Sequence, residues 1–135
     1  MKLFVSLVLL LSQVALANPT EGILGHWRTE HPQLGRGVDF HLGIEFTKFD
    51  MKMNVHCHFH DGAYLETSVV SAVDYDKSHV YIRENLETVA NDGYHYCRAT
   101  LRRSVWTAYF DGTGRMVLYV PTPYQSRFYL VRDLN

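Results

Sequence analysis

The stretch Phe49–His60, FDMKMNVHCHFH, decides the fold class of this chain. Its odd positions, from Phe49 to Phe59, are apolar, whereas its even positions, from Asp50 to His60, are polar or charged. Successive side chains of a β-strand point to opposite faces, whereas the apolar stripe of a helix repeats about every 3.6 residues. The strict alternation therefore predicts one long strand with an apolar face and a polar face.

Shorter stretches on both sides of this strand alternate too, and turn signals separate them. Asn91-Asp92-Gly93 is a hairpin signal, Asp111–Gly114 favours a second turn, and Pro121 and Pro123 end a strand because proline has no N–H to donate. Further strands are expected at residues 22–30, 42–46, 65–75, 79–83, 94–101, 105–110, 116–120 and 127–132. Thr47-Lys48 shifts the alternation as a turn or bulge would, and residues 84–89 are compatible with a turn of helix.

This pattern of about eight short strands predicts an all-β fold. A meander of that size buries its strand edges by closing on itself, so we expect a single antiparallel up-and-down β-barrel. A two-sheet β-sandwich is the alternative.

The first residues, MKLFVSLVLLLSQVALA, have the three-part layout of a secretory signal peptide. Lys2 is followed by an apolar run, Leu3–Leu11, which is shorter than the roughly 20 residues a membrane-spanning helix needs. Small residues at Ala15 and Ala17 then predict cleavage after Ala17. We therefore predict a signal peptide at residues 1–17, a domain at residues 18–135, a secreted or periplasmic location and no membrane span.

Charge and cysteine content narrow the function classes. Without residues 1–17 the chain keeps 12 Lys+Arg against 14 Asp+Glu, which gives no electrostatic basis for binding nucleic acid. The two cysteines, Cys57 and Cys97, are predicted to form a disulfide in an oxidising compartment. A thiol metal site or a catalytic thiol is the competing interpretation, although neither cysteine is in a C-x-x-C motif.

Gly25-His26-Trp27 lies on the first expected strand of the domain and resembles the Gly-x-Trp pattern of lipocalins and other calycins. The resemblance implies a small up-and-down barrel in which a basic residue of the last strand covers the tryptophan. Arg132 is the candidate here, because it shares the inward face of the last strand with Phe128 and Leu130. A guanidinium over an indole contributes about 1 to 2 kcal/mol when it is desolvated.

The lipocalin-like resemblance also implies that the barrel holds a small apolar ligand. The apolar faces supply a candidate lining: Phe46, Met51, Met53, Phe59, Trp106, Phe110 and Met116. The same residue types fill any β core, so a packed barrel stays open as an interpretation. In that case the chain is a small protein-binding module or inhibitor with a tyrosine-rich surface. That surface comprises Tyr94, Tyr96, Tyr109, Tyr119, Tyr124 and Tyr129, with Arg98, Arg102 and Arg103 nearby.

His56, His58 and His60 share the polar face of the long strand, where alternate residues lie about 7 Å apart. Two adjacent imidazoles could hold one zinc or copper ion with a third ligand from a neighbouring strand, either Asp61 or a histidine elsewhere in the chain. A solvated strand face that happens to carry imidazoles is the alternative. The chain has no G-x-S-x-G, H-E-x-x-H or phosphate-loop motif, and we expect it not to be an enzyme.

Overall fold

The computed structural model describes residues 22–122 and 125–134. The regular structure of these residues is β-strand, apart from a single 3₁₀ turn at residues 22–23. No helix within the described ranges is long and apolar enough to cross a membrane. The signal peptide predicted at residues 1–17 lies outside the described residues.

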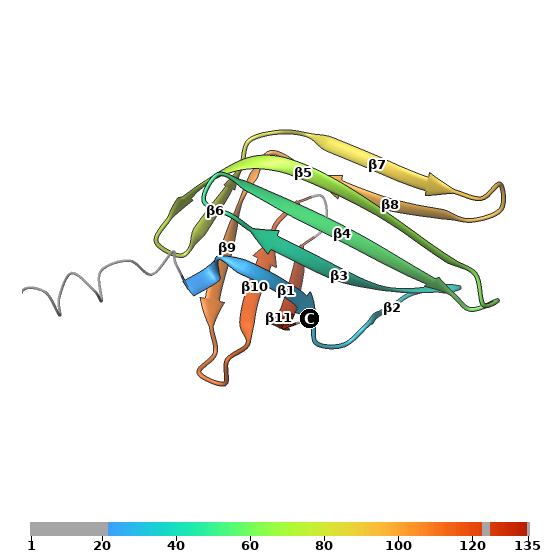
Figure 1. Cartoon of the computed structure of the whole chain (residues 1–135), viewed down its shortest axis with the longest axis horizontal. Coiled ribbons are helices and arrows are strands. Elements are labelled where there is room, and N and C mark those ends of the chain that lie inside the picture. The colour runs from blue at the N-terminus through green and yellow to red at the C-terminus, as the bar shows by residue number, and fades with distance from the viewer. Residues whose placement is uncertain (1–21, 123–124, 135) are drawn as a thin grey trace, which may run out of the picture.

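Eight strands form a closed ring, in which each strand is antiparallel to its neighbours (Figure 1). In ring order they are β1 (Gly25–Thr29), β3 (Val38–Phe46), β4 (Asp50–Phe59), β5 (Tyr64–Asp76), β6 (His79–Ile82), β9 (Ser104–Phe110), β10 (Met116–Val120) and β11 (Ser126–Arg132). The short strand β1 closes the ring, since it pairs with β11 on one side and with β3 on the other. The predicted up-and-down barrel is therefore confirmed, and the sandwich is excluded.

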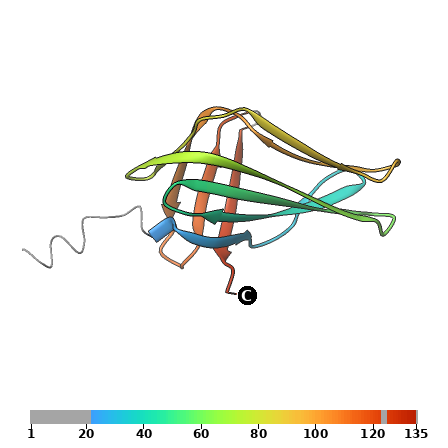
Figure 2. The same cartoon turned by 45° about the horizontal axis from the view of Figure 1, so that its top comes forward.

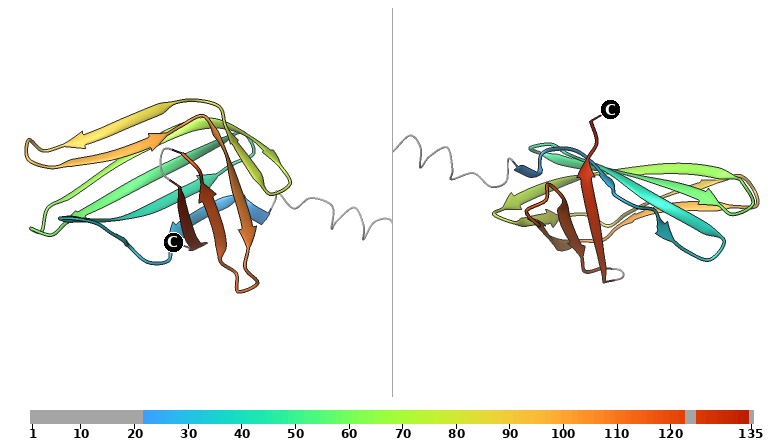
Figure 3. Two further views of the ribbon diagram at one scale, coloured as in Figure 1. Left: turned by 180° about the vertical axis from the view of Figure 1, so that it is seen from behind. Right: turned by 90° about the horizontal axis from the view of Figure 1, so that it is seen from below.

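Three of these strands are longer than the ring requires. β3, β4 and β5 run past the barrel together, and the two-residue strand β2 (Gln33–Leu34) pairs with β3 there. Figures 2 and 3 show this long three-stranded part projecting beyond the short strands β9, β10 and β11.

A separate two-stranded ribbon follows the projecting part (Figure 1). It consists of β7 (Leu86–Asn91) and β8 (Tyr96–Leu101), inserted in the chain between β6 and β9. The sequence assigned 94–101 to the ring and made 84–89 compatible with a helical turn, and both assignments were wrong. Leu86, Thr88 and Ala90 alternate with exposed residues and pair with β8, so this segment is a strand.

The barrel interior is filled by the apolar residues that the sequence alternation placed on one face of each strand. Met51, Met53, Val55 and Cys57 of β4 are all buried. Phe49, predicted to begin this apolar face, is instead 80% exposed, because it precedes β4 in the turn where the Thr47 N–H donates to the Asp50 carbonyl. The phase shift at Thr47-Lys48 is therefore a turn between β3 and β4.

One end of the barrel is closed by Trp27, which is 2% exposed. Its indole N–H donates to the Ile23 carbonyl over 2.8 Å, and the Arg132 guanidinium carbon lies 4.1 Å from the centre of its rings. Arg132 also donates to the carbonyls of Gly22 and Leu24. The structure thus brings together the Trp27 and Arg132 side chains, which ties the first strand to the last.

Candidate ligand cavity

A partly open cavity of about 380 Å³ lies at the opposite end of the barrel. This volume falls within the range of small-molecule sites. Strands β3, β4, β9, β10 and β11 and ribbon strand β8 all contribute to its wall. The lining consists of Phe40, Leu42, Ile44, Met53, Val55, Cys57, Arg98, Thr100, Trp106, Leu118, Val120, Thr122, Ser126 and Phe128.

The polar part of this lining is confined to two places. Arg98 and Thr100 come from β8, whereas Thr122 and Ser126 lie where β10 ends and β11 begins. The remaining wall is formed by inward-facing apolar side chains of the barrel strands. A ligand here would have an apolar body against the barrel and its polar atoms toward β8 and the β10–β11 connection.

Of the residues predicted to line a ligand site, some border the cavity and others lie elsewhere in the structure. Met53 and Trp106 line the cavity. Phe46, Met51 and Met116 are fully buried elsewhere in the core. Phe59 packs on the His95 ring with centroids 4.4 Å apart. Phe110, the last residue of β9, is 45% exposed and its ring centroid lies 5.9 Å from that of Trp27, at the closed end of the barrel.

Alternation identifies which face a residue occupies, but it does not give the residue's height along the barrel axis. For this reason the lining residues predicted from the sequence include some that border the cavity and some that pack at the closed end of the barrel. Phe40 was missed because the strand was predicted to begin at residue 42, whereas β3 begins at Val38. Extending the same alternation back by two residues would have found it.

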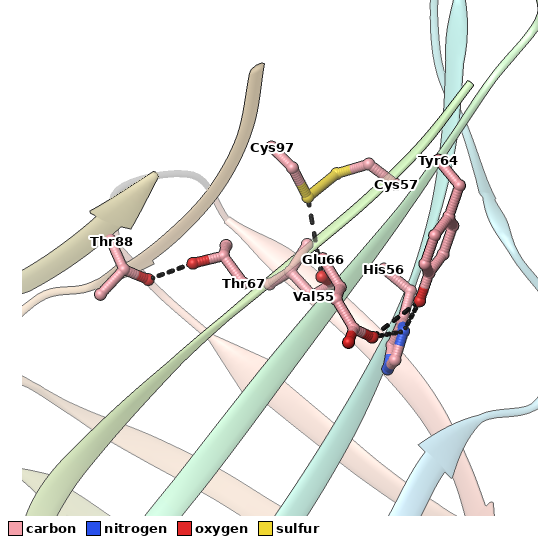
Figure 4. Close-up of a disulfide and its surroundings, with 8 residues drawn as sticks. All are labelled: Val55, His56, Cys57, Tyr64, Glu66, Thr67, Thr88 and Cys97. Atoms are coloured by element: carbon pink, nitrogen blue, oxygen red, sulfur yellow. Dashed lines mark hydrogen bonds and ion pairs between the residues drawn. A yellow bond between two sulfur atoms is a disulfide. The ribbon is translucent and has the colours of Figure 1, made fainter. Parts of the chain in front are cut away.

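The predicted disulfide between Cys57 and Cys97 is confirmed, and it fastens β8 to β4 (Figure 4). Both cysteines are buried, and Cys57 also contributes to the cavity wall. Beside the disulfide, the Thr88 hydroxyl lies 2.9 Å from that of Thr67 and donates to the Ser68 carbonyl. The ribbon is therefore held to both β4 and β5.

The tip of the ribbon has a separate attachment through His95. Its Nε2 lies 2.7 Å from Asp61 in the β4–β5 turn, and its Nδ1 lies 2.9 Å from Asp92 in its own turn. Hydrogen bonds to Asp92 and then Asp61 raise the pKa of His95. The N–H of Tyr94, followed by the bonds from His95, lowers the pKa of Asp92 to about 2.

Of the three histidines of the metal hypothesis, His56 and His58 share ring partners, whereas His60 pairs elsewhere. His56 Nδ1 lies 2.6 Å from the Tyr64 hydroxyl, which donates to Glu66, as Figure 4 shows. His60, beyond the end of β4, lies 3.1 Å from Asp39. No group of three His, Cys, Asp or Glu side chains in the described parts of the chain is arranged to hold a metal ion. Among the described residues, the structure thus places no third ligand of these types where it could share an ion with two adjacent imidazoles of this strand.

His41 of β3 instead stacks on two of these imidazoles. Its ring centroid lies 4.6 Å from that of His56 and 5.1 Å from that of His58. Burial, then the charges of His56 and His58, lowers the pKa of His41. The sequence did not single out His41, whose partner across the sheet is His56.

The predicted tyrosine surface is split into two groups. Tyr94 and Tyr96 are exposed on the ribbon, whereas Tyr109 and Tyr129 are exposed on β9 and β11, on either side of Val117. Tyr119 is half-buried on β10, and Tyr124 lies outside the described residues.

Known proteins give no independent indication of family. No family model matches the chain, and it has no significant match among curated proteins or among solved structures. The strand pairing by itself therefore defines the fold as a closed antiparallel barrel.

Proposed function

We propose that this protein is a lipocalin-like binding protein that works outside the cytoplasm and holds a small apolar molecule in the barrel. The observation that carries the proposal is the cavity of about 380 Å³ with a mainly apolar wall. Each methylene group moved from water into such a wall contributes about 0.8 kcal/mol. An aliphatic or aromatic ligand therefore has a sufficient driving force without any chemical step.

The division of the barrel into two ends supports binding at a preformed site. Trp27 and Arg132 hold the strands together at the packed end, and the disulfide holds β8 beside the open end. A cavity whose walls are already fixed costs less conformational entropy to occupy than one that must be ordered by its ligand.

Titration with a series of aliphatic alcohols, followed by calorimetry and tryptophan fluorescence, tests the proposal. Trp106 lines the cavity and Trp27 does not, so binding is expected to change the emission of Trp106. Affinity should rise with chain length until the cavity is filled. Val120→Phe, which fills the cavity, should weaken binding at least about tenfold through steric exclusion.

Tyr119→Phe is the matched control, because Tyr119 neighbours Val120 but does not line the cavity. It should bind as the unmodified protein does. Absence of heat and of fluorescence change across the whole alcohol series would refute the proposed site.

Export is a separate part of the proposal and has its own test. It is supported by the signal-peptide pattern of residues 1–17 and by the disulfide, a bond that persists in oxidising compartments. Mass spectrometry of the protein recovered outside the cytoplasm should give a chain that begins at Asn18. An N-terminus at Met1 in that fraction would contradict cleavage after Ala17.

A further inference from the structure

The charge on the cavity lining is positive. Arg98 is the one charged side chain among the described residues that line the cavity. It comes from β8, where Cys97 and Ala99 are buried while Arg98 and Thr100 contribute to the cavity wall. The strand alternation therefore places a guanidinium and a hydroxyl together at the rim.

Arg98 is not fully neutralised by its neighbours. Its Nε lies 3.1 Å from Glu87 Oε1, and Arg102 Nη2 lies 3.7 Å from Oε2 of the same carboxylate. Two guanidinium groups thus share one carboxylate, which leaves this group of three side chains with one net positive charge. A guanidinium has five N–H donors, and one carboxylate engages at most two of them, so Arg98 retains donors for a second anion.

We propose that Arg98 binds the carboxylate head group of a single-chain apolar acid whose tail occupies the cavity. This inference rests on the proposed function and adds the charge of the ligand to it. The planar guanidinium fits a carboxylate better than it fits a hydroxyl, and it repels an ammonium group. Thr100, on the same face of β8, supplies a further hydroxyl beside the head group.

The experiment compares ligands that share one tail. Dodecanoate, dodecanol and dodecylamine are titrated by calorimetry at neutral pH, below the concentrations at which they aggregate. Because Arg98 is largely exposed, dodecanoate is expected to bind about two- to fivefold more tightly than dodecanol, and dodecylamine more weakly than either. Added salt should reduce the preference, since it screens exposed charges.

Three variants locate the preference. Arg98→Gln should bind dodecanoate and dodecanol equally, whereas Glu87→Gln should bind dodecanoate more tightly because the competing carboxylate is gone. Arg103→Gln is the matched control, because it removes the same charge from an exposed residue that does not line the cavity. It should keep the preference for dodecanoate.

The outcomes separate the two proposals. Equal binding of dodecanoate and dodecanol by the unmodified protein, or an undiminished preference in Arg98→Gln, would overturn the role of Arg98 while leaving the apolar site intact. Failure of all three ligands to bind would refute the cavity as a binding site and the head-group inference with it.

Discussion

Both the backbone conformation and the surroundings of Gly25 require a glycine two positions before Trp27. Its φ is +115°, a backbone conformation that L side chains rarely adopt. A Cβ built on Gly25 would also lie 2.7 Å from Nη1 of Arg132. The motif therefore combines a backbone requirement with the space needed for the arginine that covers the tryptophan.

Gly25→Ala is expected to destabilise the protein by about 1 to 3 kcal/mol, the usual cost of a residue held in an unfavourable backbone region. Urea unfolding followed by tryptophan fluorescence measures this change. Gly43→Ala is the matched control, since Gly43 is also on a barrel strand but the nearest atom to an added Cβ is 3.8 Å away. Equal losses of stability in both variants would contradict the explanation.

His41 is expected to make the protein less stable on acidification. Its pKa in the folded protein is below the ordinary 6.5, so protonation favours the unfolded chain. Its share of stability is therefore present above about pH 6.5 and is lost as the pH falls toward the lowered pKa. His41→Gln should make the unfolding free energy depend less on pH between about pH 7 and pH 5.

His95 supplies a control of opposite sign. Its pKa is raised, so its stabilising contribution is present at acidic pH and is lost as the pH rises through the raised value. His95→Gln should therefore steepen the loss of stability on acidification. The same direction of change in both variants would show that the two histidines do not act as their surroundings indicate.

The β7–β8 ribbon is attached to the barrel without being part of its hydrogen-bonded ring. It contacts the ring strands through the disulfide, the Thr67 and Thr88 hydroxyls and the His95–Asp61 pair, and its buried Ala99 and Leu101 side chains belong to the same apolar core as the barrel. The barrel strands have a complete backbone ladder of their own. The ribbon can therefore loosen without opening the ring.

Replacing both Cys57 and Cys97 with alanine is expected to cost about 2 to 4 kcal/mol, because the bond restricts the unfolded chain across a separation of 40 residues. Hydrogen exchange should become faster mainly in residues 86–101, whose tether to β4 is lost. Amides of β10 and β11 serve as the internal control and should change less. Equal acceleration in the ribbon and in those strands would show that the two parts unfold as one unit.

The barrel as a whole combines a packed end and a hollow end within one ring of strands. Inward-facing residues of the same strand serve both ends: Met116 is packed away from the cavity, whereas Leu118 and Val120 line it. On β11, Phe128 lines the cavity and Leu130 is fully buried. Ligand binding is therefore expected at one end, while the other end maintains closure.

The sequence by itself determined the features that depend on short-range periodicity and on residue chemistry. The alternation from Asp50 to Phe59 is enough to define a two-faced strand, because the β period is a local property. Cys57 and Cys97 were the only possible disulfide partners in the chain. The pairing of Trp27 with Arg132, in contrast, was implied only by the resemblance of Gly25-His26-Trp27 to the Gly-x-Trp pattern.

Only the tertiary structure decided which strands form the ring and which residues border the cavity. The chain leaves the ring after β6 and returns to it at β9. This path depends on contacts between strands far apart in the sequence, and local propensity carries no information about such contacts. For the same reason Met53 lines the cavity while Met51 is packed, although both belong to one apolar face. Position along the barrel axis is set by pairing register and by the ends of neighbouring strands, and neither is encoded in the period of a single strand.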